Sequence, residues 1–113
     1  MRVFNRTRQT TLADRAVAAR SFWARLRGLM GRPSLSPGEG LVLFGDNSIH
    51  MFFMRFPIDV LYLDTDSRII RLDESLRPWR VGPMVRGCQC IVELPAGTIQ
   101  STQTAIADQI LLE

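Results

Sequence analysis

A chain of 113 residues, 46% hydrophobic and 22% charged, is long enough for one hydrophobic core and lacks the polar composition of disordered chains. We therefore expect a single domain spanning residues 1–113. No stretch approaches the roughly 18 apolar residues of a membrane-spanning helix, and residues 1–8 lack the apolar region of a signal peptide, so we expect a cytoplasmic protein.

Charge is unevenly distributed along the sequence. All fourteen basic residues are arginine, and the formal net charge is +3. Eight arginines precede Ser36 with only Asp14 opposing them, whereas the remainder holds six arginines and ten acidic residues. This asymmetry fits either an Arg-rich patch for nucleic acid or two halves whose charges interleave on the folded surface. We expect the second, so nucleic acid is not an expected partner.

The N-terminal third predicts a hairpin, a helix and a loop. Two β-leaning pieces within residues 3–17 surround a polar stretch, which is typical of a hairpin. Ser21 is a suitable N-cap for a short helix over residues 22–27, and Gly28 would end it. Residues 31–40 are dense in Gly, Pro and Ser and predict an irregular loop.

The rest of the sequence predicts strands. Residues 58–63 and 68–72 flank the turn formers of residues 64–67 and predict a hairpin. Further strands are expected over residues 41–44, 48–54, 88–94 and 109–112. Many short strands with one or two short helices predict a mainly β fold, either a compact antiparallel β-barrel or a β-sandwich.

Three stretches carry a family resemblance, namely residues 28–32 with 40–44 (GLMGR, GLVLF), residues 49–64 (IHMFFMRFPIDVLYLD) and residues 92–98 (VELPAGT). In order and spacing they resemble the domain of unknown function 192 (DUF192) family. The resemblance implies a compact β-rich domain, mostly bacterial or archaeal, with no established activity. It therefore implies no catalytic residues.

Polar residues within these motifs are the candidate site. His50 is the only histidine, and it either satisfies a buried hydrogen bond or titrates near neutrality as an acid or base. Arg55 and Asp59 flank Pro57, and they either form an ion pair that holds the bend or recognise a ligand. Glu93 alternates with apolar neighbours and either joins an ion pair or supplies a second carboxylate.

Trp79 and two cysteines complete the candidates. Trp79 lies between arginines in a loop bounded by Pro and Gly, where it either stacks on a ligand or covers the edge of the core. Cys88 and Cys90 would lie on one strand face, but a zinc site needs two more ligands and the usual spacing is missing. We expect two buried thiols, no metal site and no cofactor.

We therefore expect a noncatalytic binding or accessory module, in which His50, Arg55, Asp59, Trp79 and Glu93 line a site for a small polar ligand or a protein partner. The alternative is a small enzyme that uses His50 with Asp59 or Glu93 as an acid/base pair, although the sequence contains no familiar catalytic motif. The third alternative is a weak nucleic-acid binder that acts through its arginines.

Overall fold

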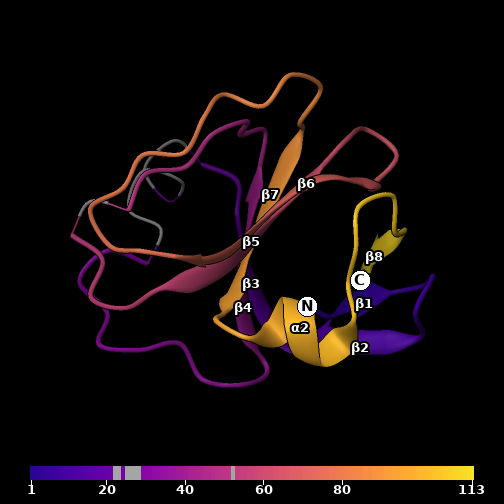
Figure 1. Ribbon diagram of the computed structural model, residues 1–113, viewed down its shortest axis with the longest axis horizontal. Helices are drawn as coiled ribbons and strands as arrows, with labels where there is room; N and C mark the ends of the chain where they lie inside the picture. The colour runs from indigo at the N-terminus through magenta and orange to yellow at the C-terminus, as the bar shows by residue number, and fades with distance from the viewer. Residues whose placement is uncertain (22–23, 25–28, 52) are drawn as a thin grey trace.

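The computed structural model describes residues 1–21, 24, 29–51 and 53–113 (Figure 1). Its strands form two sheets, and the strand orders leave both open at their edges. In order across the sheets, the larger contains β3 (Arg15–Ala19), β4 (Glu39–Phe44), β7 (Cys90–Pro95), β5 (Ile58–Leu63) and β6 (Ile69–Leu76), and the smaller contains β2 (Thr10–Ala13), β1 (Val3–Asn5) and β8 (Ile110–Leu112). The mainly β class is confirmed, but the sheets do not close into a barrel.

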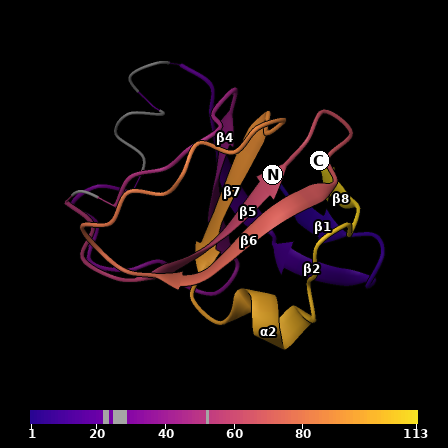
Figure 2. The ribbon, with the colours of Figure 1, turned by 45° about the horizontal axis from the view of Figure 1, so that its top comes forward.

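The five-stranded sheet is the middle layer of the molecule. The three-stranded sheet and the short helix α2 (Thr98–Thr102) lie on one side of it (Figure 2). A first core fills the space between them, with Val3, Leu12, Val92 and Ile99 among its members. Because this core contains residues from both sheets and the helix, it holds the two ends of the chain together.

Three long connections cover the opposite face of the five-stranded sheet. β3 pairs with β4 in parallel. β4 and β5 both run antiparallel to β7, so they are parallel to each other. β6 and β7 both run antiparallel to β5, so they are also parallel to each other. Each connection must therefore return across the sheet. These crossovers lie within residues 20–38, 45–57 and 77–89, and the structure describes them apart from residues 22–23, 25–28 and 52. A second core lies beneath them, with Leu35, Met51 and Tyr62 among its members.

The central strand β5 follows from its composition. Every one of its six residues is buried, as expected for a strand with apolar side chains on both faces. The predicted hairpin with β6 is confirmed. β6 extends four residues beyond the predicted strand, and the register shifts between Ile58 and Val60, close to Ser75 with its φ of 51°.

The opening hairpin is confirmed for β1 and β2 but ends earlier than predicted. At Asp14 the chain leaves the small sheet, and the N–H groups of Asp14 and Arg15 both donate to the carbonyl of Gly38, at 3.1 and 2.9 Å. Arg15 begins β3, which joins the large sheet parallel to β4. The fold is therefore not wholly antiparallel.

The predicted strand over residues 48–54 is wrong. Within its described part this segment is irregular, with a single β-bridge between His50 and Val81. It pairs instead with the third crossover, through bonds such as Met51 N–H to the Arg80 carbonyl (2.6 Å) and Gly82 N–H to the Ile49 carbonyl (2.8 Å). Its backbone runs outside the sheet because β7 already lies between β4 and β5.

The predicted helix over residues 22–27 lies almost wholly outside the described residues. The N–H of Ala24 donates to Ser21 Oγ at 3.1 Å, the contact expected of an N-cap. None of the helices within the described ranges is long and apolar enough to cross a membrane.

Candidate binding site beneath the crossovers

Glu93 places a carboxyl group inside an apolar layer. It lies in β7 between Leu41 of β4 and Val60 of β5, on the face that the crossovers cover. Only 4% of Glu93 is exposed, and its Oε2 atom is buried without a hydrogen-bond partner. Burial, and then the negative charge of Asp46, raise the pKa of this carboxyl to about 8. Glu93 is therefore mostly protonated at neutral pH and is a hydrogen-bond donor.

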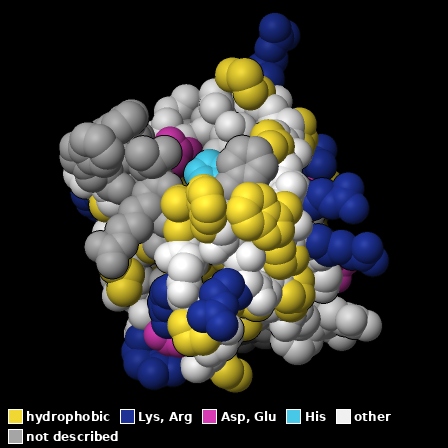
Figure 3. Space-filling view, turned by 90° about the vertical axis from the view of Figure 1, so that its left-hand side faces the viewer, with side chains coloured by type: hydrophobic (Ala, Val, Ile, Leu, Met, Phe, Trp, Pro, Cys, Tyr) yellow, Lys and Arg dark blue, Asp and Glu magenta, His cyan; other side chains and the backbone are white. Residues whose placement is uncertain are grey.

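His50 lies in the crossover that covers this layer. Its neighbours Ile49 and Met51 are buried in the second core, whereas His50 is half-buried. Figure 3 shows the imidazole at the surface, with an acidic side chain and a group of apolar side chains beside it. His50 is therefore half-buried in a crossover, whereas Glu93 is buried in the sheet that the crossovers cover.

Phe53 and Trp79 bring two aromatic side chains together at the surface. Their ring centroids are 5.0 Å apart with planes tilted by 60°, and the two residues are 58% and 59% exposed. Both have left-handed backbones, with φ of 61° and 65°. Such a conformation costs on the order of 1–3 kcal/mol for a bulky residue. Backbone hydrogen bonds hold both, from Gly31 N–H to the Phe53 carbonyl and from Trp79 N–H to the Met51 carbonyl.

Asp59 is part of the framework and does not meet Glu93. It pairs with Leu94 in the register of β5 and β7, so its side chain lies on the opposite face of the sheet. Its Oδ1 accepts the N–H of Ser75 at 2.9 Å, and its Oδ2 accepts the N–H of Ile99 at 2.8 Å. A fully buried carboxylate thus fixes the irregular part of β6 and the first turn of α2.

The hypothesis of an ion pair between Arg55 and Asp59 is wrong. Arg55 is exposed, and within the described part of the chain no ion pair joins the two side chains. Asp59 has its oxygens occupied by backbone N–H groups, which makes a guanidinium partner unnecessary. Of the five predicted site residues, His50, Arg55 and Trp79 lie in the crossovers, Glu93 lies in the sheet beneath them, and Asp59 lies on the opposite face of the sheet.

The two cysteines belong to different layers, contrary to the expectation that they share a face. Cys88 is in the second core and Cys90 in the first. Burial raises the pKa of the Cys88 thiol, and burial followed by the Cys88 charge raises that of Cys90 to about 12. Both are free thiols. Neither thiol is activated for nucleophilic attack at neutral pH.

A second polar cluster borders the crossovers and had no signal in the sequence. The Tyr62 hydroxyl donates to Asp73 Oδ2 at 2.7 Å, and Arg71 also donates to Asp73. Burial and then the Asp73 hydrogen bond raise the pKa of Tyr62 well above its ordinary value. An open groove of about 470 Å³ lies beside this cluster, with Arg77 and Arg80 in its lining.

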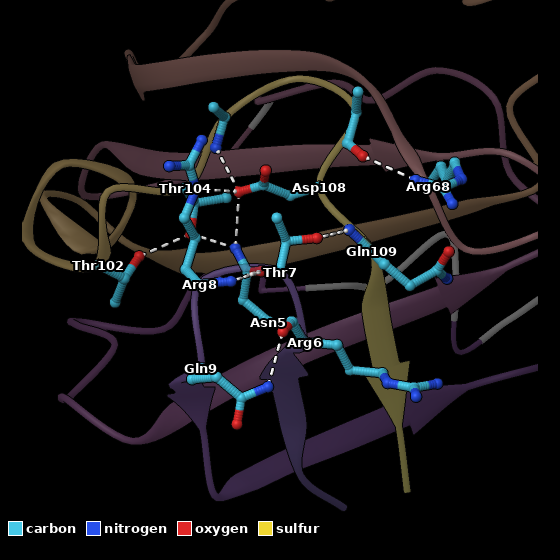
Figure 4. Close-up of polar contacts among 12 residues, drawn as sticks. Asn5, Arg6, Thr7, Arg8, Gln9, Arg68, Thr102, Thr104, Asp108 and Gln109 are labelled. Atoms are coloured by element: carbon cyan, nitrogen blue, oxygen red, sulfur yellow. Dashed lines mark hydrogen bonds and ion pairs between the residues drawn. The ribbon is translucent and has the colours of Figure 1, made fainter.

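A third polar cluster lies under the small sheet and is fully connected (Figure 4). Asn5 Nδ2 donates to Thr104 Oγ1 at 3.2 Å and to Asp108 Oδ2 at 2.9 Å, and Arg8 Nε donates to the same Asp108 oxygen at 3.0 Å. Burial opposes ionisation of Asp108, but these bonds and one from Ala105 lower its pKa below the ordinary value. Because its donors and acceptors are paired, we assign this cluster to stability.

Arginines of the N-terminal third pair with acids from the rest of the chain. Arg2 pairs with Glu113, Arg8 with Asp108 and Arg32 with Glu39. The charges of the two halves therefore interleave, as expected from the sequence. Within the described residues, no group of three or more His, Cys, Asp and Glu side chains is arranged to hold a metal ion.

A two-sheet β domain with irregular crossovers over one face is thus the class that the fold defines. The model of the DUF192 family, described as an uncharacterized ACR, matches residues 3–112. The chain belongs to the DUF192 family, and the predicted resemblance is confirmed.

The relatives are proteins of the same uncharacterised kind. A UPF0127 protein from Thermococcus sibiricus is 34% identical over 112 residues, which cover 96% of this chain and 72% of the relative. A second, from Thermococcus kodakarensis, is 30% identical with coverage of 96% and 71%. Both source organisms are archaea. These relatives establish the family without naming an activity.

Two crystal structures have the same fold. A protein of unknown function from Novosphingobium aromaticivorans superposes with a TM-score of 0.85 at 19% identity, covering 98% of this chain and 82% of that one. A protein from Sinorhizobium meliloti, named a "putative transcription regulator", superposes with a TM-score of 0.79 at 21% identity, covering 97% and 89%. At these identities the likeness establishes the fold alone.

Proposed function

We propose that this domain is a noncatalytic binding module for a small polar ligand, held beneath the crossovers against Glu93. The observation that carries the proposal is the buried Oε2 atom of Glu93, which has no hydrogen-bond partner. A buried polar atom without a partner destabilises the fold, and native proteins rarely keep one without a use for it. A ligand that pairs with this atom would recover the lost hydrogen bond.

The protonation state of Glu93 indicates the chemistry of the ligand. With a pKa of about 8, the carboxyl carries little charge at neutral pH and can donate a hydrogen bond to a ligand. It therefore favours a neutral molecule with a carbonyl, hydroxyl or ring-nitrogen acceptor over a simple cation. His50, in the crossover above, would contribute a second polar contact at the surface side of the site. The free thiols of Cys88 and Cys90 support a cytoplasmic location.

Native mass spectrometry of the protein as purified tests the proposal. We expect a noncovalent adduct of defined mass on the wild-type protein, and its loss in Glu93→Leu, which keeps the apolar packing but removes the carboxyl. The exposed Glu74 supplies the matched control, and Glu74→Gln should keep the adduct. An adduct that survives unchanged in Glu93→Leu would contradict the assignment. So would the absence of any adduct together with no thermal shift from a panel of neutral polar metabolites.

An acid/base enzyme is the second candidate, because a carboxyl with a pKa near neutrality suits a general acid. Only Glu93 supports it, since Asp59 has both oxygens bound to backbone N–H groups on the other face. Time-resolved mass spectrometry of the released ligand separates the two candidates. A binding module returns its ligand with the same mass, whereas an enzyme converts it.

A further inference from the structure

The exposed side of the third crossover combines apolar and cationic side chains. Trp79, Val81 and Met84 are 59%, 65% and 78% exposed, and Phe53 packs beside Trp79. We call these four residues the loop-tip surface. Figure 3 views this end of the molecule and shows apolar side chains gathered on it, with basic side chains beside and below them. Phe53 and Trp79 are in ring contact, and Val81 and Met84 follow Trp79 on the same exposed crossover. Exposed apolar side chains of this kind are candidates for an interaction surface.

Arginines accompany the loop-tip surface on the same crossover. Arg77 and Arg80 line the groove of about 470 Å³ together with Val81, and Arg86 lines a neighbouring depression with Met84. All three arginines are exposed, and no acidic side chain of the described ranges forms an ion pair with them. Their charge is therefore available to an anionic partner, unlike that of Arg2, Arg8 and Arg32.

We propose that the loop-tip surface and these arginines bind the surface of membranes that contain anionic phospholipids. Exposed Met and Val side chains have no hydrogen bonds to offer and gain most from contact with acyl chains. A Trp side chain suits the headgroup level of a bilayer, and neighbouring arginines attract anionic headgroups. The open groove beside Arg77 and Arg80 has room for a phosphate-bearing headgroup.

The geometry favours a lipid surface over a nucleic acid. A single-stranded nucleic acid needs open aromatic faces on which bases stack. Here the Phe53 and Trp79 rings pack against each other at a 60° tilt, and the protruding neighbours are aliphatic. Binding of an oligonucleotide in place of vesicles is therefore an outcome that would overturn the proposal.

Vesicle sedimentation tests the proposal with the full-length protein. We expect it to sediment with phosphatidylcholine vesicles containing about one-third phosphatidylglycerol, at least fivefold more than with phosphatidylcholine alone, and less at high salt. Both Met84→Ser with Val81→Ser and Arg77→Gln with Arg80→Gln should reduce binding at least fivefold. Equal binding to both kinds of vesicle, or no binding to either, would overturn the proposal.

Matched controls lie away from this surface. Val17 is 63% exposed on β3, and Arg6 is exposed in the turn between β1 and β2, which Figure 1 places on the side of the molecule opposite the crossovers. Val17→Ser and Arg6→Gln should bind vesicles as the wild type does. A loss in either control equal to that of the loop-tip variants would show nonspecific adhesion and reject the surface.

Fluorescence supplies a second readout that does not depend on the amount sedimented. The sequence contains two tryptophans, so in Trp23→Phe the emission reports Trp79 alone. Anionic vesicles should shift this emission to shorter wavelength, because the indole enters a less polar environment. Emission that stays unchanged while the protein sediments would place the membrane contact elsewhere and contradict the proposal.

Discussion

Asp59 and Glu93 are both buried in the five-stranded sheet, on neighbouring strands and opposite faces. Asp59 accepts hydrogen bonds from two backbone N–H groups, whereas the Oε2 atom of Glu93 has no hydrogen-bond partner. Burial of a carboxyl group without a donor favours its protonated form, and the pKa of Glu93 is raised accordingly. Two acidic residues from adjacent motifs therefore have different roles, one in the framework and one in the proposed site.

Replacing Glu93 by Gln should change how stability depends on pH. The carboxyl pKa rises from 4.5 to about 8 on folding, so the folded state holds the extra proton between these values. The free energy of unfolding must then fall as pH rises through this range, by on the order of 4 kcal/mol at the upper end. Glu93→Gln should remove this decrease, so the variant gains stability over the wild type as pH rises.

Urea denaturation at pH values below and above this range measures the effect, with Glu74→Gln as the exposed control. The control should keep the decrease of the wild type. If Glu93→Gln loses as much stability as the wild type does on going to alkaline pH, the proton is not held by Glu93 in the folded state.

At the level of elements, α2 depends on a residue distant in sequence. It begins after Gly97, has no side-chain N-cap of its own, and has the N–H of Ile99 bound by Asp59 from β5. The same carboxylate holds Ser75, where β6 departs from regular register. Asp59 therefore joins two elements that have little local tendency to take their observed form.

Asp59→Asn should loosen both elements at once. An amide presents an NH₂ group where one carboxylate oxygen stood, so one backbone N–H loses its acceptor, at a cost of about 2 kcal/mol. We expect faster amide hydrogen exchange at Ser75 or Ile99 and a lower denaturation midpoint. Asp14→Asn is the control, because the exposed contact of Asp14 with Arg15 contributes little. Unchanged exchange at both amides would refute the role assigned to Asp59.

Local pattern predicted the elements that depend on neighbouring residues. β5 and its turn into β6 follow from apolar runs around a cluster of turn formers, and the opening hairpin follows in the same way. Elements whose form depends on residues distant in the sequence were not predicted. These include the transfer of β3 to the large sheet through Gly38 and the start of α2, where Asp59 accepts the N–H of Ile99. They also include the irregular backbone in the described part of residues 45–57.

The candidate site was predictable to the same extent. Glu93 and His50 stood out because a polar residue among apolar neighbours needs an explanation. Whether a hydrogen-bond partner would meet Glu93 could not be predicted from local pattern, and Asp59 was an equally strong candidate. The sheet register pairs Asp59 with Leu94, and it therefore shows that the Asp59 and Glu93 carboxyl groups lie on opposite faces of the sheet.

On the scale of the whole molecule, the five-stranded sheet has two different faces. The face under the small sheet and α2 is a regular core, with its neighbouring polar groups paired in the Asn5 and Asp108 cluster. On the other face, Glu93 is buried in the sheet beneath the crossovers. The crossovers themselves contain exposed arginines and the left-handed residues Phe53 and Trp79. We therefore propose that the first face serves stability and the second serves binding.

The measurement that tests this assignment most directly is a carbon-13 NMR titration of the Glu93 side-chain carboxyl, with Glu93→Gln used to identify its signal. We expect a midpoint near pH 8, because the carboxyl is buried away from water and has no hydrogen-bond donor beside it. A midpoint close to 4.5 would show a solvated or paired carboxylate and would contradict the proposed binding site.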